Sequence, residues 1–204
     1  MKLKNMKEFG IITTFLLLGA FSTNVFAHCD TMDGPTVIDG QKAMKENNVN
    51  YVLKWVEPKS EKEIKEIFNL SMKVKDLSPE SKQLAEKYFF GELVRIHREA
   101  EGAAYSGVKP SGTTTDKKIL AADKSIEIEN LSPLANLIEK DKKAELKKRF
   151  DKVISLKNFD VNDVKAGREY IHAYVNFFKF AEGEEDHAHV NSHEKEVEPT
   201  KHQH

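Results

Sequence analysis

His28 and Cys29 carry more metal-binding chemistry than any other stretch of the chain. If the chain begins at His28, these two residues offer a terminal amine, an imidazole, a backbone amide and a thiolate. Square-planar sets of nitrogen and thiolate donors suit Ni(II) and Cu(II). The pair therefore predicts a transition-metal hook at a processed N-terminus, with copper or nickel as the metal and redox chemistry as one use for it.

Residues 1–27 have the pattern of a secretory signal peptide. A lysine-rich start is followed by an apolar segment over residues 11–20 and by small residues at Val25 and Ala27. Cleavage after Ala27 would leave His28 as the first residue of a protein that is periplasmic or secreted. Processing at this bond is a condition for the hook, because it creates the amine donor.

Cys29 is the only cysteine of the chain, so no disulfide can form within it. A single thiol in an exported protein calls for an explanation. It is a metal ligand, one half of an intermolecular bridge, or a residue without function. The neighbouring His28 favours the first of these interpretations.

His97 and Glu101 form a second candidate site, because residues four apart share one helix face and can reach the same ion. One histidine with one carboxylate is an incomplete metal site, so the alternative is a buried, hydrogen-bonded histidine in a polar patch. The two candidates combine if His28 folds onto this face. The amine and imidazole of His28 would then clasp copper together with His97 or His172, as in a histidine brace.

The stretch His28-Cys29-Asp30, followed by Gly34, resembles the mature N-terminus of nickel superoxide dismutase, whose hook reads His-Cys-Asp-x-x-Cys-Gly-x-Tyr. The resemblance covers only the hook, and it implies that the amine, amide, thiolate and imidazole of the first two residues bind the metal. The stretch departs from that pattern at two positions. Asp33 stands in place of the second cysteine and becomes a candidate carboxylate ligand, and Thr36 stands in place of the tyrosine.

Four longer blocks resemble a family of exported bacterial helical proteins with no assigned function. The blocks read HCDTMDGP, NVNYVLKWV, YFFGELVRIHREAEGAAYSGVKPSG and AGREYIHAYV. The resemblance implies that these four blocks belong together in one fold. It brings no activity with it.

Apolar residues recur at helical spacing from Val37 onward, which predicts an all-α protein. Ser78-Pro79 and Ser132-Pro133 are typical helix starts, and Ser60-Glu61-Lys62-Glu63 has the pattern of a capping box. Asp160 is expected to cap the last helix. We expect a helical bundle of about four long helices plus short ones, in which facing helices build a site from their side chains.

The longest predicted helix runs from Ser78 to about Glu101 and should position His97. Its expected inward-facing residues are Leu84, Tyr88 or Phe89, Leu93, Ile96, His97 and Ala100. The segment 102–112, which contains several glycines and a proline, predicts a loop around Tyr105. Tyr105 and Lys109 in this loop either cover a site or only fix the conformation of the loop.

The composition limits other functions. With 32 basic and 33 acidic residues in the full sequence, the part after residue 27 has a net charge of about −3, which gives no reason to expect nucleic acid or an anionic membrane surface. No later apolar run approaches the ~20 residues of a membrane span. Residues 28–182 are expected to form a single helical domain. Residues 183–204 are expected to form a disordered tail rich in His and Glu, whose histidines are solvated or bind metal loosely.

These patterns together predict an exported all-α protein that binds copper or nickel through His28 and Cys29, with Asp33, His97 and Glu101 as further ligands. Metal-dependent oxidoreductase activity is one use for such a site. The alternative is an exported, non-catalytic binding or stress protein whose N-terminus only packs as a turn. The sequence leaves the substrate, the partner and a homo-oligomeric state open.

Overall fold

The structure, a computed structural model, describes residues 28–113 and 116–183, and over these residues the chain is all-α, as the sequence predicts. The elements are α1 (Pro35–Glu46), α2 (Asn50–Leu53), η2 (Pro58–Ser60), α3 (Glu61–Val74), α4 (Pro79–Ala100), α5 (Lys117–Glu127), η3 (Ser132–Leu134), α6 (Lys143–Leu156) and α7 (Val164–Glu182). The predicted signal peptide and the predicted tail beyond Gly183 lie outside the described residues. None of the described helices is long and apolar enough to cross a membrane.

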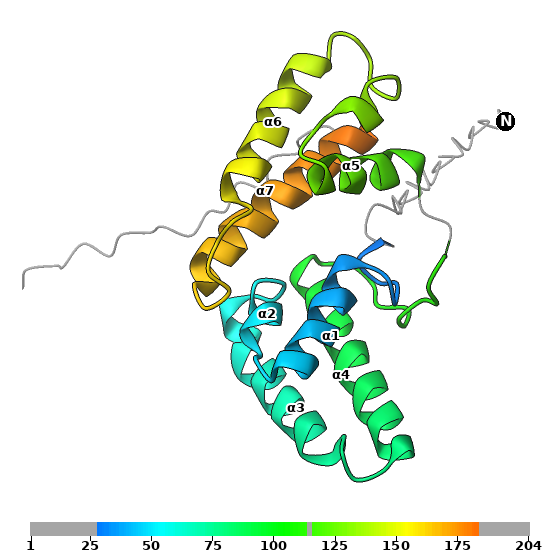
Figure 1. Cartoon of the computed structure of the whole chain (residues 1–204), viewed down its shortest axis with the longest axis vertical. Coiled ribbons are helices and arrows are strands. Elements are labelled where there is room, and N and C mark those ends of the chain that lie inside the picture. Colours follow the sequence, from blue (N-terminus) through cyan, green and yellow to red (C-terminus); the bar gives the residue numbers. More distant parts are fainter. Residues whose placement is uncertain (1–27, 114–115, 184–204) are drawn as a thin grey trace, which may run out of the picture.

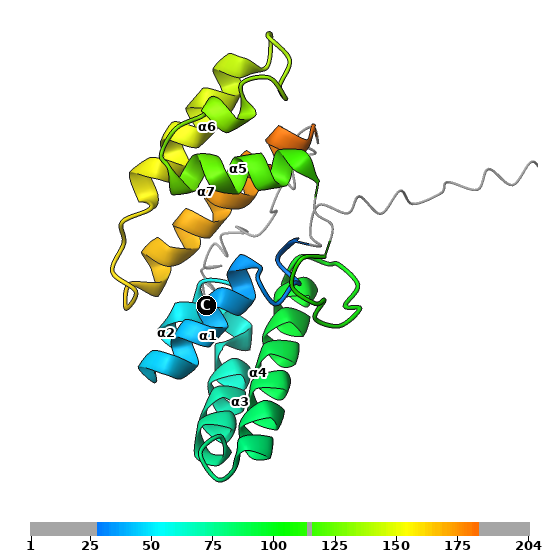
Figure 2. The same cartoon turned by 45° about the vertical axis from the view of Figure 1, so that its right-hand side comes forward.

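The helices form two lobes, α1–α4 and α5–α7 (Figures 1 and 2). Each lobe has its own cluster of buried apolar side chains, built around Phe89 and Leu93 in the first lobe and around Phe150 and Phe177 in the second. Two side chains depart from this division. Cys29, before α1, and Trp55, after α2, are buried in the cluster of the second lobe. The N-terminal segment and the turn after α2 therefore lie where the lobes meet.

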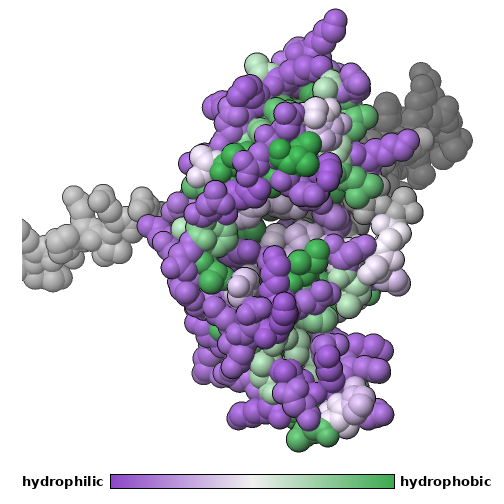
Figure 3. Space-filling view, in the orientation of Figure 1, coloured by the Kyte–Doolittle hydropathy of each residue, from purple (hydrophilic) through white to green (hydrophobic). Residues whose placement is uncertain are grey.

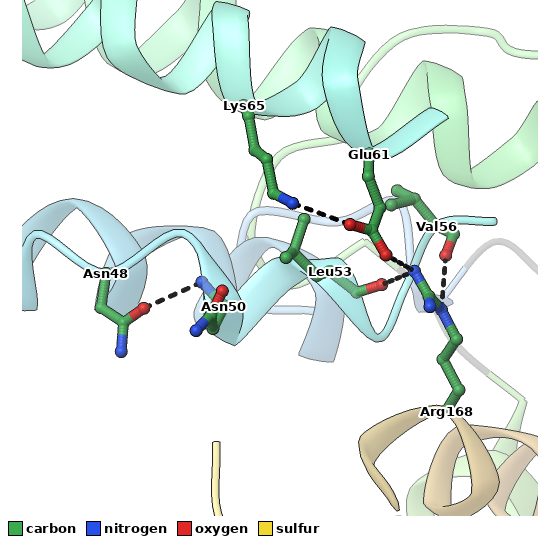
Figure 4. A network of polar contacts seen from close by, with 7 residues as sticks. All are labelled: Asn48, Asn50, Leu53, Val56, Glu61, Lys65 and Arg168. Atoms are coloured by element: carbon green, nitrogen blue, oxygen red, sulfur yellow. Dashed lines mark hydrogen bonds and ion pairs between the residues drawn. The ribbon is translucent and has the colours of Figure 1, made fainter. Parts of the chain in front are cut away.

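Arg168 on α7 ties the second lobe to the first (Figure 4). Its guanidinium donates to the carbonyl oxygens of Leu53, at 3.2 Å, and Val56, at 3.1 Å, and to Glu61 Oε1 at 2.7 Å. The carbonyls at the end of a helix have no partner within that helix, so the guanidinium satisfies the end of α2. Lys65 holds the other oxygen of Glu61 at 2.7 Å.

The predicted start at Ser78 is confirmed, whereas the predicted capping box at Ser60 is wrong. Ser78 and Ser81 form a reciprocal capping box at the start of α4. Ser60 ends the short helix η2 and has φ −96° and ψ 0°, and its side chain makes no capping hydrogen bond. A capping side chain needs a residue in the extended region. Glu63, the other half of the expected box, instead pairs with Arg95 on α4.

The chain between α5 and α7 also differs from expectation. Ser132 starts only the short helix η3, and α6 begins at Lys143. Leu134 and Ile138 between them are buried, so this stretch packs its apolar side chains without a continuous helix. The cap of α7 is Asp163, which accepts from the amide of Ala166, rather than Asp160.

The buried face of α4 agrees with the predicted stripe over its C-terminal half. Phe89, Leu93 and Ile96 are at most 1% exposed. Of the two alternatives Tyr88 and Phe89, it is Phe89 that faces the core, while Tyr88 is 46% exposed. Leu84 was expected to face inward, yet it is 69% exposed, because only Ala85 and the residues from Phe89 onward meet the core at that end. The buried half of α4 ends at His97. Because His97 contacts Trp55, whose side chain is buried in the cluster of the second lobe, the last turn of α4 lies where the lobes meet.

Candidate functional site

The residues before α1 form a tight turn that needs glycine at position 34. The carbonyl oxygen of His28 accepts from Thr31 Oγ1 at 3.2 Å, and the amide of Gly34 donates to the carbonyl of Thr31 at 2.9 Å. A Cβ atom on residue 34 would lie 2.1 Å from the oxygen of His28. Real Cβ atoms essentially never come so close, so this turn, residues 28–34, excludes any side chain at Gly34.

The glycine-rich loop that the sequence predicts holds this turn in place. The amide of Met32 donates to the carbonyl of Lys109 at 2.9 Å, and the amide of Lys109 donates to the carbonyl of Asp30 at 2.7 Å. Asp33 Oδ2 accepts from the amide of Gly112 at 2.8 Å, and the side chain of Thr31 together with this contact lowers the pKa of Asp33. Asp33 is exposed and fastens the loop, away from the buried end of α4.

The side chain of His28 points to the second lobe. Its imidazole lies against the carboxylate of Asp123 on α5, with 14% of the His28 side chain exposed. The other oxygen of Asp123 accepts from the hydroxyl of Tyr174 on α7 at 2.9 Å. Asp123 and Tyr174 were not recognised from the sequence, because nothing in their spacing relates them to a residue far away in the chain. Only the packing of the two lobes brings them to His28.

Cys29 is buried among acidic residues and is 8% exposed. Burial raises the pKa of its thiol far above the ordinary value, and the negative charges of Glu101, Asp30 and Asp123 raise it further, while the side chain of Thr36 opposes them. A thiol in this setting stays protonated and unreactive. The same negative surroundings attract a cation.

The imidazole of His97, which is 3% exposed, is fixed in one protonation form. Its Nδ1 lies 2.9 Å from the backbone carbonyl of Trp55. A carbonyl only accepts, so Nδ1 carries the proton and Nε2 keeps a free lone pair. Burial lowers the pKa of His97 to about 4, so the ring is neutral. Nε2 lies 3.5 Å from Glu101 Oε1 and has no hydrogen-bond partner among the described residues.

Arg98 bridges the two carboxylates beside His97. Its Nε lies 3.1 Å from Asp30 Oδ2, and its Nη1 lies 3.4 Å from Glu101 Oε2. Burial raises the pKa of Asp30 to about 6 and that of Glu101 to about 7, although the charge of Arg98 acts against both shifts. Asp30 is 1% exposed, and its Oδ1 has no hydrogen-bond partner among the described residues. Lys109 also acts against the shift of Asp30 and Lys179 against that of Glu101, yet Oδ1 of Asp30 keeps no hydrogen bond within the described part of the chain.

Stability of the metal-free protein should depend on pH through Glu101. A carboxyl whose pKa rises from 4.5 to about 7 on folding binds its proton more tightly in the folded state, so its contribution is complete below pH 4.5 and is lost as the pH rises through 7. Relative to Glu101→Gln, the native protein should lose on the order of 1–3 kcal/mol of unfolding free energy between about pH 5 and pH 8. Urea unfolding of both proteins across this range measures the difference.

The comparison with Glu101→Gln removes other titrations from the result. His97, whose pKa is lowered from 6.5 to about 4, acts in the opposite direction, because the unfolded chain takes up its proton first as the pH falls. That contribution is present in both proteins and cancels in the difference. A difference that stays constant with pH would show that Glu101 is not shielded from water in the folded protein.

The predicted ligands divide into two groups. His28 contacts Asp123, the Cys29 thiol interacts with Glu101, and Glu101 lies 3.5 Å from His97, whereas Asp33 lies at the loop. His172 is exposed on α7, where its Nδ1 lies 3.3 Å from the amide nitrogen of Asn176, and it makes no contact with His28 among the described residues. Within residues 28–113 and 116–183, no three His, Cys, Asp or Glu side chains are placed closely enough to hold a metal ion.

Comparison with known proteins identifies a family but no activity. The chain matches no curated protein and no solved structure. A family model described as a family of unknown function, DUF6448, matches residues 33–180 of the 204 in the chain. His97, Glu101 and Asp123 lie inside the matched range, and His28 and Cys29 precede it. The chain belongs to the DUF6448 family of unknown function.

Proposed function

We propose that this protein is exported and binds one copper or nickel ion where its processed N-terminus meets the end of α4. Cys29, His97 and Glu101 supply side-chain ligands, and His28 supplies an imidazole and the amine freed by cleavage after Ala27. The bound metal is suited to redox chemistry. The observation that carries the proposal is the buried, unpartnered Nε2 of His97.

The surroundings of His97 are those of a metal-binding histidine. Such a residue usually donates its other ring N–H to a carbonyl or a carboxylate, which fixes the tautomer and the ring orientation. The carbonyl of Trp55 fills this role at Nδ1, and the lone pair of Nε2 faces Glu101 at 3.5 Å. A buried polar atom without a partner is costly, and a metal ion bound at Nε2 would remove this cost.

The charge around Cys29 also favours a cation. Glu101, Asp30 and Asp123 all raise the pKa of the thiol, so each lies near enough to interact with it. Arg98, Lys109 and Lys179 act against the effect of this negative charge, yet the pKa values of both Asp30 and Glu101 stay raised. A divalent ion would neutralise the carboxylates and displace the thiol proton, because metal ligands bind in their deprotonated forms. The ligands lie too far apart without metal, so binding must draw Cys29, His97 and Glu101 together.

Two donor sets remain for the metal. In a hook, the amine, amide and thiolate of His28 and Cys29 bind it within the first residues of the mature chain. In a brace, the amine and imidazole of His28 act together with His97. Cleavage between Ala27 and His28 is required by both, and intact-mass measurement of the exported protein checks it. A mature chain that starts elsewhere removes the amine.

The proposal predicts one tight site for Cu(II) or Ni(II) in protein that starts at His28. Cys29→Ser and His97→Gln should each weaken it by about 10–100-fold or more, because each removes a ligand from a shielded site. One residue added before His28 should weaken it similarly, since the side chains stay and only the amine is displaced. Isothermal titration calorimetry at one pH measures all three, with a copper and a nickel series.

Two controls separate the site from incidental binding. His172→Gln removes an exposed histidine of the same domain and should leave the tight site unchanged. Deleting the chain from Glu184 onward removes five histidines and should also leave it unchanged. Unchanged binding by Cys29→Ser and by the N-terminally extended chain would refute the proposal and favour a non-catalytic protein whose N-terminus only packs as a turn. Loss of binding in His97→Gln and in the extended chain, with Cys29→Ser unchanged, would select the brace over the hook, whereas loss in Cys29→Ser and in the extended chain, with His97→Gln unchanged, would select the hook.

A further inference from the structure

A cavity of about 370 Å³ lies between the lobes, beside the indole ring of Trp55. The space-filling view shows the surface hollowed where the lobes meet (Figure 3). Much of the cavity lining is aromatic, with Tyr51, Trp55, Phe159, Tyr170 and Tyr174. Its volume falls within the ≈ 300–1,000 Å³ range of small-molecule sites. Neither the metal proposal nor the family accounts for this cavity.

The aromatic rings form a continuous wall. Phe159 and Tyr170 have ring centroids 5.5 Å apart, Tyr170 and Tyr174 are 6.1 Å apart, and Tyr174 meets Trp55 edge-on at 6.1 Å. These residues come from α7, the segment before it and the turn after α2, so the wall spans both lobes. Contiguous rings of this kind offer flat faces and edges to another ring.

The charged groups of the cavity are three lysines and one carboxylate, Asp39. Asp39 is already satisfied by its own neighbours. Its Oδ2 accepts from Trp55 Nε1 at 2.8 Å and lies 2.9 Å from Lys54 Nζ, and its Oδ1 lies 3.7 Å from Lys42 Nζ. Lys157 pairs with Glu129, outside the lining, at 3.0 Å. Lys42 is 56% exposed and shares Asp39 with Lys54, so it carries the least compensated positive charge.

The position of Lys54 excludes a cationic ligand. Aromatic cavities often bind ammonium groups over their rings. Here the ammonium of Lys54 already lies 5.8 Å from the ring centre of Trp55 and 5.2 Å from that of Phe159. A second cation would meet this charge without a free carboxylate to offset it. The cavity is therefore suited to an anion.

We propose that this cavity binds a planar aromatic molecule that carries an anionic group such as a carboxylate. The ring system packs against the half-buried rings of Tyr51, Phe159 and Tyr170, next to Trp55, which is 4% exposed, and the anionic group faces the ammonium of Lys42. The cavity is separate from the metal ligands, so this proposal does not depend on metal binding. Trp55 is shared between the two places, because its ring faces the cavity while its carbonyl holds His97.

The test uses three probes of nearly equal shape and different charge: 2-naphthoate, 2-naphthalenemethanol and 2-naphthylmethylammonium. Trp55 is the only tryptophan, so its indole N–H gives a single signal in a ¹⁵N–¹H correlation spectrum. Because this N–H donates to Asp39 at the cavity, its shift reports occupancy of this site. The metal-free protein should bind naphthoate most tightly and the ammonium probe most weakly.

Variants then assign the charge and the location. Lys42→Gln should weaken naphthoate binding about two- to fivefold, the scale of one partly exposed ion pair, and should not change binding of the neutral probe. Lys45→Gln, the matched control on the same helix, lies outside the cavity lining and should bind as the native protein does. Val161→Phe, at the half-buried rim, should reduce binding about tenfold or more by filling the space.

Four results would overturn the proposal. The first is equal binding of all three probes, and the second is an equal effect of Lys42→Gln and Lys45→Gln. The third is an indole signal that stays in place at millimolar naphthoate while thermal melting shows the protein folded. Naphthoate binding that survives Val161→Phe would place the probe elsewhere and would equally count against it. Copper and nickel titrations play no part in these outcomes.

Discussion

Gly34→Ala should expose Cys29 and raise its rate of alkylation by about a hundredfold or more, because the thiolate is the reacting form. In the native turn Cys29 is 8% exposed, and burial keeps its thiol protonated. A Cβ at position 34 would lie 2.1 Å from the carbonyl oxygen of His28, so the turn must open. The freed thiol then approaches the ordinary pKa of about 8.5. Iodoacetamide labelling of metal-free protein, followed by mass spectrometry, measures the rate.

Gly91→Ala is the matched control for this experiment. Gly91 lies within α4, and an added Cβ there would meet only Tyr105 Oη at 3.4 Å, an ordinary contact. Cys29 in the Gly91→Ala protein should be labelled at the native rate. The helicity of this protein by circular dichroism should match that of the Gly34→Ala protein. If Cys29 reacts at the native rate in Gly34→Ala, then the N-terminal turn does not hold the thiol buried. If the proposed metal site is correct, Gly34→Ala, which opens the turn, should also lower the affinity for copper or nickel.

Leu93→Ala should lower the free energy of unfolding by about 2–5 kcal/mol, the range for truncating a fully buried leucine. Leu93 is 0% exposed and belongs to the core of the α1–α4 lobe. Gly40 on α1 shows how tightly this place is packed, because a Cβ there would lie 3.2 Å from Leu93 Cδ2. The neighbouring side chains therefore cannot easily fill the space left by the leucine. Urea unfolding followed by circular dichroism measures the loss.

Leu84→Ala makes the same truncation as Leu93→Ala at an exposed position of the same helix. Leu84 is 69% exposed, so its truncation should change the unfolding free energy by no more than about 0.5 kcal/mol. The contrast between the two substitutions checks the orientation of α4, on which the position of His97 depends. Equal losses at the two positions would mean that α4 is rotated from the orientation described here.

The fold class and the main helices could be predicted from the sequence because their signals are local. Helical spacing of apolar residues and the Ser78-Pro79 start are visible within a few turns of chain, and α4 begins and ends close to the expected residues. The predictions that were wrong relied on a local pattern that the surroundings override. Ser60 ends a short helix instead of capping α3, and Leu84 is apolar yet lies beyond the reach of the core.

The candidate site could be predicted only in part. The i, i+4 spacing of His97 and Glu101 fixes them on one helix face, and the density of donors at His28 and Cys29 is plain in the sequence. Asp33 shares the turn with Cys29, but its carboxylate accepts from Gly112. Proximity in the chain therefore did not decide which side chains point into the junction of the lobes.

The sequence by itself determined that the protein is helical, that His97 and Glu101 lie on one face, and that the N-terminal turn is rich in metal donors. The tertiary structure decided the partners of these residues: the carbonyl of Trp55 at His97, Arg98 between Asp30 and Glu101, and Asp123 at His28. The physical reason is the distance along the chain over which each effect acts. Helix formation and capping depend on neighbours in the chain, whereas burial and its effect on the pKa of a carboxyl or thiol depend on segments that meet only when the two lobes pack.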